Sequence, residues 1–123
     1  MRWLILGCAL PVLTATASHA QEIRNYTGTV LTGQSIDFDH WLNYDQSSCV
    51  DRGFIVFQLK SPPRLGKMTL VRKKVQSPGV CSNHPLSVVI VQYRAGRKAG
   101  VDSFSYGVQG LQVILVNATV NVN

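Results

Sequence analysis

The chain has 123 residues, of which 46% are apolar and 15% charged, and its 12 Lys and Arg against 6 Asp and Glu give a net charge of +6. This length fits one domain, and the low charged fraction excludes disorder driven by charge repulsion. No apolar run reaches the roughly 18 residues that a spanning helix needs, which excludes a polytopic membrane protein.

The N-terminal segment has the pattern of a cleavable signal peptide. Arg2 supplies a positive charge, residues 3–13 are apolar, and small residues dominate from 14 to 20. This order predicts cleavage after Ala20, with residues 1–20 removed and 21–123 left as a single domain. The apolar stretch is too short for the alternative, an uncleaved membrane anchor. We therefore expect an exported protein, periplasmic or extracellular, with no transmembrane segment after cleavage.

Beyond residue 20, apolar residues alternate with polar ones at the two-residue period of β-strands. In chain order, the predicted strands are 23–31, 35–38, 54–59, 67–72, 86–93, 102–108 and 116–123. The richly apolar segments 54–59 and 86–93 are expected to be central strands. About seven strands separated by turns predict an all-β fold, an antiparallel β-sandwich.

Two cysteines, Cys49 and Cys81, follow the predicted cleavage site. Export would place them in an oxidising compartment, where we expect one disulfide between them. Cys81 and His84 have the local spacing of a zinc site, but no second pair accompanies them. Asp37 and Asp39 supply too few oxygens for calcium and are expected to be solvated acids. No metal or other cofactor is therefore expected.

A pattern in the C-terminal half resembles a known repeat family. A strand that ends in Val91 and Tyr93 leads through a short loop to Gly100, Asp102, Phe104 and Tyr106, and a Val- and Thr-rich strand follows. With the turn at 63–68, this pattern is similar to bacterial Ig-like or cadherin-like repeats and covers residues 62–122. The basic loop at 94–98 departs from the family, which usually has proline and aromatic residues there. The resemblance implies an Ig-like sandwich and a binding or structural role, without chemistry.

The same residues also have a direct physical interpretation. Gly100 suits a tight loop, and Asp102 suits a carboxylate that accepts backbone hydrogen bonds beside it. Phe104 and Tyr106 point to one face of their strand and are expected to fill the interior of the sandwich.

Catalytic machinery is not expected. Downstream of the predicted leader the chain offers only His40 and His84 as histidines, and it lacks the G-x-S-x-G turn of serine hydrolases. The two cysteines are better explained by a disulfide than as nucleophiles. A chain of this length also has little room for a cleft beside a two-sheet core. We therefore predict that the protein is not an enzyme.

An aromatic segment at residues 41–44 is one candidate binding loop. Trp41 and Tyr44 stand beside Asn and Asp residues, a combination that can stack on a sugar ring or anchor a protein interface. The alternative is that Trp41 is a core aromatic that packs near the disulfide, as in many sandwiches.

Positive charge gathers in two groups and gives a second candidate. The first group is Arg64, Lys67, Arg72, Lys73 and Lys74, and the second is Arg94, Arg97 and Lys98. A merged patch would attract anionic surfaces through a salt-sensitive mechanism, and we expect Arg72, Lys73, Lys74, Arg97 and Lys98 to contribute. The alternative is a solvated face that keeps the protein soluble. No aromatic residues interleave with the basic ones, which makes nucleic acid an unlikely partner.

These observations favour a small exported, non-catalytic Ig-like module of the bacterial envelope. Its expected partner is an envelope protein or an anionic polysaccharide, and its oligomeric state is left open. The alternative is a secreted inhibitor or ligand of a host or competitor protein, with Trp41 and Tyr44 as its anchor.

Overall fold

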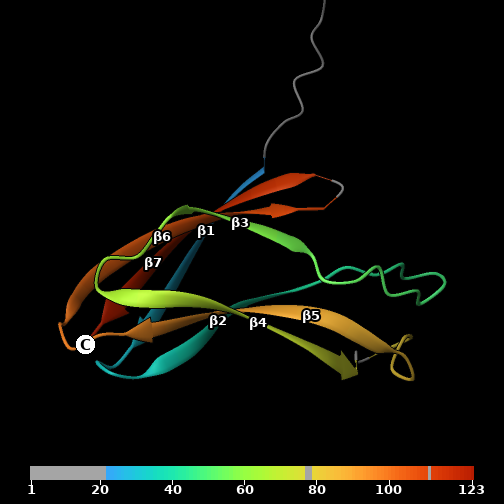
Figure 1. Cartoon of the computed structure of the whole chain (residues 1–123), viewed down its shortest axis with the longest axis horizontal. Helices are drawn as coiled ribbons and strands as arrows, with labels where there is room; N and C mark the ends of the chain where they lie inside the picture. Colours follow the sequence, from blue (N-terminus) through green and yellow to red (C-terminus); the bar gives the residue numbers. More distant parts are fainter. Residues whose placement is uncertain (1–21, 77–78, 111) are drawn as a thin grey trace, which may run out of the picture.

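Seven strands stack as two sheets (Figure 1). The computed structural model describes residues 22–76, 79–110 and 112–123, so the predicted signal peptide lies outside the described residues. The strands are β1 (Glu22–Val30), β2 (Ser35–Leu42), β3 (Val56–Ser61), β4 (Gly66–Gln76), β5 (Pro85–Ala95), β6 (Gly100–Gln109) and β7 (Val113–Val122). This arrangement confirms the predicted all-β sandwich.

One sheet has the strand order β1-β7-β6-β3 and the other has the order β2-β5-β4. Four of the five pairings are antiparallel, but β1 runs parallel to β7, with Glu22 opposite Ile114 and Val30 opposite Val122. The predicted antiparallel sandwich therefore has one parallel pairing, at this edge. Strand direction is opposite in β1 and β2, in the paired strands β2 and β5, in β5 and β6, and in the paired strands β6 and β7. An even number of reversals leaves β1 and β7 pointing the same way.

The core forms where the inner faces of β5, β6 and β7 meet. Every second residue of β7 from Val116 to Val122 is at most 2% exposed, which confirms the predicted alternation. Phe104 and Tyr106 also point inward, as predicted, and Phe104 stacks on Tyr93 with ring centroids 5.7 Å apart. The other buried members of the core cluster are aliphatic, so the interior is apolar along most of its length.

The two segments predicted as central strands have different positions. Residues 86–93 lie in β5, which is flanked by β2 and β4 and is buried along most of its length, as predicted. Residues 54–59 lead into β3, which is an edge strand, so that prediction was wrong. Val56 is 58% exposed and Leu59 49% exposed, whereas Phe57 faces the core. Apolar composition alone cannot distinguish a central strand from an edge strand whose outer face happens to be apolar.

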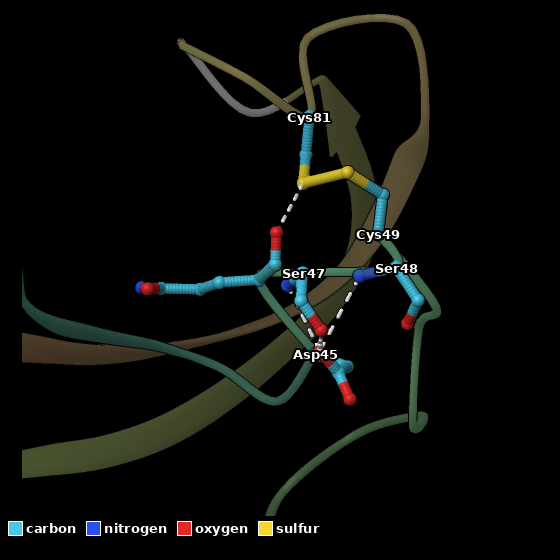
Figure 2. Close-up of a disulfide and its surroundings, with 6 residues drawn as sticks. Asp45, Ser47, Ser48, Cys49 and Cys81 are labelled. Carbon is cyan, nitrogen blue, oxygen red and sulfur yellow. Dashed lines mark hydrogen bonds between the residues drawn. A yellow bond between two sulfur atoms is a disulfide. The ribbon is translucent and has the colours of Figure 1, made fainter.

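The connections gather at the two ends of the sandwich (Figure 1). Three short connections, 31–34, 62–65 and 96–99, meet at one end with the C terminus. The longer connection 43–55 and residues 79–84 of the β4–β5 connection lie at the opposite end. The predicted disulfide joins them there, with the Cα atoms of Cys49 and Cys81 5.4 Å apart (Figure 2). We call these the short-loop end and the disulfide end.

Candidate functional site

The short-loop end is organised by a buried carboxylate. Asp102 is only 2% exposed, near the start of β6. It accepts hydrogen bonds from the backbone amides of Arg64, Leu65 and Gly66 at 2.8, 2.9 and 3.1 Å. The hydroxyl of Tyr93 donates to it at 2.7 Å, and its neighbour Ser103 donates an amide hydrogen bond at 2.9 Å. These contacts agree with the predicted role of Asp102, and they extend it to a turn far away in the sequence.

Burial of Asp102 disfavours its charged form, but the hydrogen bonds oppose this effect. The amide of Arg64, the Tyr93 hydroxyl and the other amides together hold the pKa of Asp102 below its ordinary value. Burial and the adjacent carboxylate raise the pKa of Tyr93. Asp102 is therefore ionised at neutral pH, and its oxygens are occupied by donors within the fold. It holds the turn in place and has no free oxygen for a ligand.

Two glycines let the turn approach β5 closely. A Cβ atom on Gly66 would lie 2.3 Å from the carbonyl oxygen of Arg94, and one on Gly96 would lie 2.5 Å from the carbonyl oxygen of Leu65. The Gly96 amide donates to that Leu65 oxygen at 3.0 Å. No larger residue fits either position without a shift of the backbone. The turn and the β5–β6 connection are thus held together as one rigid surface.

A surface hollow of about 480 Å³ opens on this rigid surface. Its lining is formed by Arg64, Leu65, Gly66, Lys67, Arg94, Ala95 and Gly96. The three cationic side chains are exposed, and none of them forms an ion pair within residues 22–76, 79–110 and 112–123. The lining offers no carboxylate, hydroxyl, thiol or imidazole side chain, so all of its charged side chains are cationic.

The strand register sets two of these cations side by side. Lys67 on β4 lies directly opposite Arg94 on β5, so their side chains leave the same face of the sheet. Cβ atoms of directly opposed residues are about 4.5–5.5 Å apart, and like charges at this separation destabilise a sheet. Arg97 and Lys98 are exposed in the β5–β6 connection next to this pair. The short-loop end is therefore strongly cationic, and we call Arg64, Lys67 and Arg94 the basic hollow.

The structure does not bring all the predicted basic residues together. Arg72, Lys73 and Lys74 lie near the far end of β4, opposite Val89, Val88 and Ser87 of β5. From Lys67 to Lys73 the strand advances six residues, or about 20 Å. Lys74 instead pairs with Asp51 at 3.3 Å at the disulfide end. The basic residues thus form two separate groups, one at each end.

The aromatic segment at residues 41–44 is not a free loop. Trp41 is the second-to-last residue of β2, packs against the core, and donates an indole hydrogen bond to Asp39. Asp39 also accepts a hydrogen bond of 2.7 Å from the Tyr106 hydroxyl, and the Arg24 guanidinium lies 5.2 Å from the Trp41 ring centroid. Tyr44 forms an isolated backbone bridge with Asp51. These contacts engage the ring and the indole NH of Trp41 within the fold, where the side chain is half-buried.

Gly100 has a φ of 148°, within the range that L side chains rarely adopt, at the start of β6. No group of three or more metal-ligating side chains occurs in the part of the chain that the structure describes. In the same part, no helix is long and apolar enough to cross a membrane.

Arg64, Lys67 and Arg94 belong to the two basic groups in the sequence, but none of them is among the five residues expected to contribute to a merged patch. Their closeness follows from the β4–β5 register, in which Gly66 opposes Ala95. Lys67 and Arg94 are equally far along the sequence from the middle of the β4–β5 hairpin, and this equal spacing could have revealed that they face each other. The prediction that Asp39 is a solvated acid was wrong, because its carboxylate accepts hydrogen bonds from Trp41 and from the buried hydroxyl of Tyr106. No sequence signal marked Asp39 or Asp51 as a partner of a buried hydroxyl.

Comparison with protein families, curated proteins and solved structures gave no significant match. The resemblance of residues 62–122 to bacterial Ig-like repeats therefore stays a prediction.

Proposed function

We propose that the protein is an exported, non-catalytic binding module whose basic hollow holds an anionic polysaccharide of the bacterial envelope. The observation that carries this proposal is the direct opposition of Lys67 and Arg94 on adjacent strands. Two cations in this position repel each other in the free protein. An anionic group placed between them would remove that repulsion, so the arrangement favours the bound state.

The shape of the site suits an extended, charged ligand. The volume of about 480 Å³ falls within the range of about 300–1,000 Å³ typical of ligand sites. The hollow is open and lacks aromatic side chains, so stacking would contribute little and charge attraction would dominate. Arg97 and Lys98 extend the positive surface beyond the hollow and suit a polymer that carries repeated negative charges.

Two further observations support this proposal over the others considered. The disulfide agrees with an oxidising, exported location, where polysaccharide is more abundant than nucleic acid. The competing anchor for a protein inhibitor was Trp41, whose ring and indole NH are already engaged by Arg24 and Asp39. An envelope protein with an acidic surface would use the same cations, so competition between that protein and the polysaccharide tests this alternative.

The proposal is tested with two double variants that remove the same charge from opposite ends. Lys67→Gln with Arg94→Gln neutralises the hollow, whereas Arg72→Gln with Lys73→Gln neutralises the other group. The probe is immobilised heparin, a sulfated polysaccharide, with neutral dextran as the control matrix. We expect the hollow variant to elute at clearly lower salt than the wild type, with the distal variant close to the wild type. Equal effects of the two variants would show attraction by net charge alone and would contradict a defined site.

A further inference from the structure

Two valines beside the disulfide are exposed without any role in the core. Val50 is 56% exposed and Val80 is 94% exposed, and they are the direct neighbours of Cys49 and Cys81. The cysteine Cα atoms are 5.4 Å apart. With about 3.8 Å between consecutive Cα atoms, the two valine Cα atoms lie within about 13 Å of each other. We call Val50 and Val80 the valine tip.

The first of the two loops is rigidly held. The Asp45 carboxylate accepts hydrogen bonds from the Ser47 hydroxyl at 2.7 Å and from the amides of Ser47 and Ser48 (Figure 2). The Asp45 amide donates to the Val50 carbonyl oxygen at 2.9 Å. These contacts fold residues 45–50 into a compact turn, so the exposure of Val50 does not come from a loose loop.

The same loop is tied to the sandwich by Asp51. Its carboxylate accepts a hydrogen bond of 2.6 Å from the hydroxyl of Ser87, which is buried in β5, and it pairs with Lys74 at 3.3 Å. The Ser87 hydroxyl, as the main cause, lowers the pKa of Asp51 to about 2. Asp51, the residue next to Val50, is therefore held against Lys74 of β4 and Ser87 of β5.

The second loop presents Val80 at the apex of a turn. The Ser82 amide donates to the carbonyl oxygen of Gly79 at 3.1 Å, which closes a turn around Val80 and Cys81. Gly79 has a φ of 94°, a conformation that L residues rarely adopt. The backbone and the disulfide together hold a nearly fully exposed valine outward, although that side chain gains nothing from the fold.

Cations accompany the valine tip. Arg72, Lys73 and Lys74 are exposed at this end of β4, and the Lys74 side chain is 62% exposed despite its contact with Asp51. Aliphatic side chains at a protruding tip, with cations set back from them, match the layering of a membrane surface. Hydrocarbon begins below a layer of phosphate groups, and anionic lipids attract nearby Lys and Arg.

We propose that the disulfide end docks on an anionic lipid bilayer, with Val50 and Val80 entering the interface and Arg72, Lys73 and Lys74 at the level of the phosphates. Lipid is favoured over a protein partner because protein hot spots are enriched in Trp, Tyr and Arg, and valine is under-represented there. The two valines are aliphatic, so the valine tip itself offers no aromatic or arginine anchor of the kind that a protein interface uses. This proposal does not depend on the basic hollow, which lies at the opposite end.

The test measures binding to vesicles. The full 123-residue chain is expressed into an oxidising compartment, and the purified protein is mixed with vesicles of phosphatidylcholine alone or with 30% phosphatidylglycerol. We expect binding to the anionic vesicles and a loss of about tenfold or more in partition coefficient for Val50→Ser with Val80→Ser. The matched control is Val101→Ser, since Val101 is 69% exposed at the opposite end of the molecule. That variant should bind like the wild type.

A second pair of variants separates this proposal from the proposed function. Lys67→Gln with Arg94→Gln should weaken heparin binding and leave vesicle binding nearly unchanged. Val50→Ser with Val80→Ser should weaken vesicle binding and leave heparin binding nearly unchanged. Vesicle binding lost only in the hollow variant would overturn the bilayer proposal. Heparin binding that is insensitive to both variants would overturn only the proposed function.

Insertion itself is tested by fluorescence. Tryptophan placed at position 80 by Val80→Trp should show blue-shifted emission on anionic vesicles, after subtraction of the wild-type spectrum, whereas Val101→Trp should not. No vesicle binding, or binding without this shift, would contradict insertion. If purified envelope protein binds and its binding requires both valines while vesicles do not bind, the tip is a protein-docking site and the bilayer proposal is wrong.

Discussion

The hydroxyl of Tyr93 donates a hydrogen bond of 2.7 Å to the carboxylate of Asp102 across the interior of the sandwich. Tyr93 belongs to the three-stranded sheet and Asp102 to the four-stranded sheet, so this bond joins the two layers. The same carboxylate binds the backbone amides of residues 64–66, which form one wall of the basic hollow. One buried charge therefore fixes the packing of the sheets and the shape of the candidate site.

Asp102→Asn should strongly destabilise the protein. Asparagine keeps the shape of the side chain but replaces an acceptor oxygen with an NH₂ group that faces hydrogen-bond donors. Each buried donor left unpaired costs about 1–3 kcal/mol, so the free energy of unfolding should fall by about 3 kcal/mol or more. Tyr93→Phe should cost about 1–2 kcal/mol because it removes one of these donors with its partner left in place. Urea unfolding measures both, and a loss below 1 kcal/mol for Asp102→Asn would contradict this role.

Gly66→Ala should be poorly tolerated, whereas Gly107→Ala should be nearly neutral. A Cβ on Gly66 meets the Arg94 carbonyl oxygen at 2.3 Å, and the backbone must move to relieve this contact. The nearest atom to a Cβ on Gly107 is the flexible Lys60 Cε at 3.5 Å. We expect Gly66→Ala to cost about 1–3 kcal/mol and to weaken heparin binding, because it displaces Lys67 from Arg94. Thermal unfolding and salt elution of the two variants test this, and equal behaviour of the two would contradict the close approach.

The fold was largely predictable because its strands carry a clear alternation. From Val116 to Val122 in β7, valine and alanine occupy the inner face and asparagine or threonine the outer face. The edge position of β3 was not predictable, because Val56 and Leu59 are apolar yet exposed. The parallel pairing of β1 with β7 depends on the direction of every intervening strand, which is a property of the whole chain.

The candidate site was predictable only in its residue types. The density of Lys and Arg indicated an anionic partner, and the cysteine count indicated the disulfide. Lys67 and Arg94 are 27 positions apart in the sequence. They lie opposite each other because of the β4–β5 register, in which Gly66 is opposite Ala95. The exposure of Val80 depends on the turn geometry at Gly79 and on the crosslink, which no periodic pattern reports.

Stability should fall in acid because of Asp51. Its pKa of about 2 in the folded protein lies below the value of about 3.9 expected in the unfolded chain. The ionised form is therefore favoured by folding, and this stabilisation is complete above about pH 4 and is lost as the pH falls toward 2. Asp102, whose pKa is also lowered, acts in the same direction.

Ser87→Ala removes the hydrogen bond that contributes most to the low pKa of Asp51. We expect this variant to be less stable at pH 7 by about 1–2 kcal/mol and to lose less stability than the wild type between pH 4 and pH 2. Urea unfolding across this pH range measures the difference. Parallel pH profiles for the two proteins would show that Ser87 does not set the titration of Asp51.

Trp41 should act as a stabilising residue and not as a binding anchor. Trp41→Phe keeps most of the apolar contact but leaves Asp39 with the Tyr106 hydroxyl as its remaining side-chain donor, and we expect a loss of about 1 kcal/mol. Trp41→Ala also removes the packing against the core and the contact with Arg24, and we expect a loss of about 2–4 kcal/mol. Heparin binding by the folded fraction should stay unchanged in both variants, since Trp41 lies outside the hollow lining. A Trp41→Ala variant with wild-type stability but no binding to a purified partner protein would instead support the anchor hypothesis.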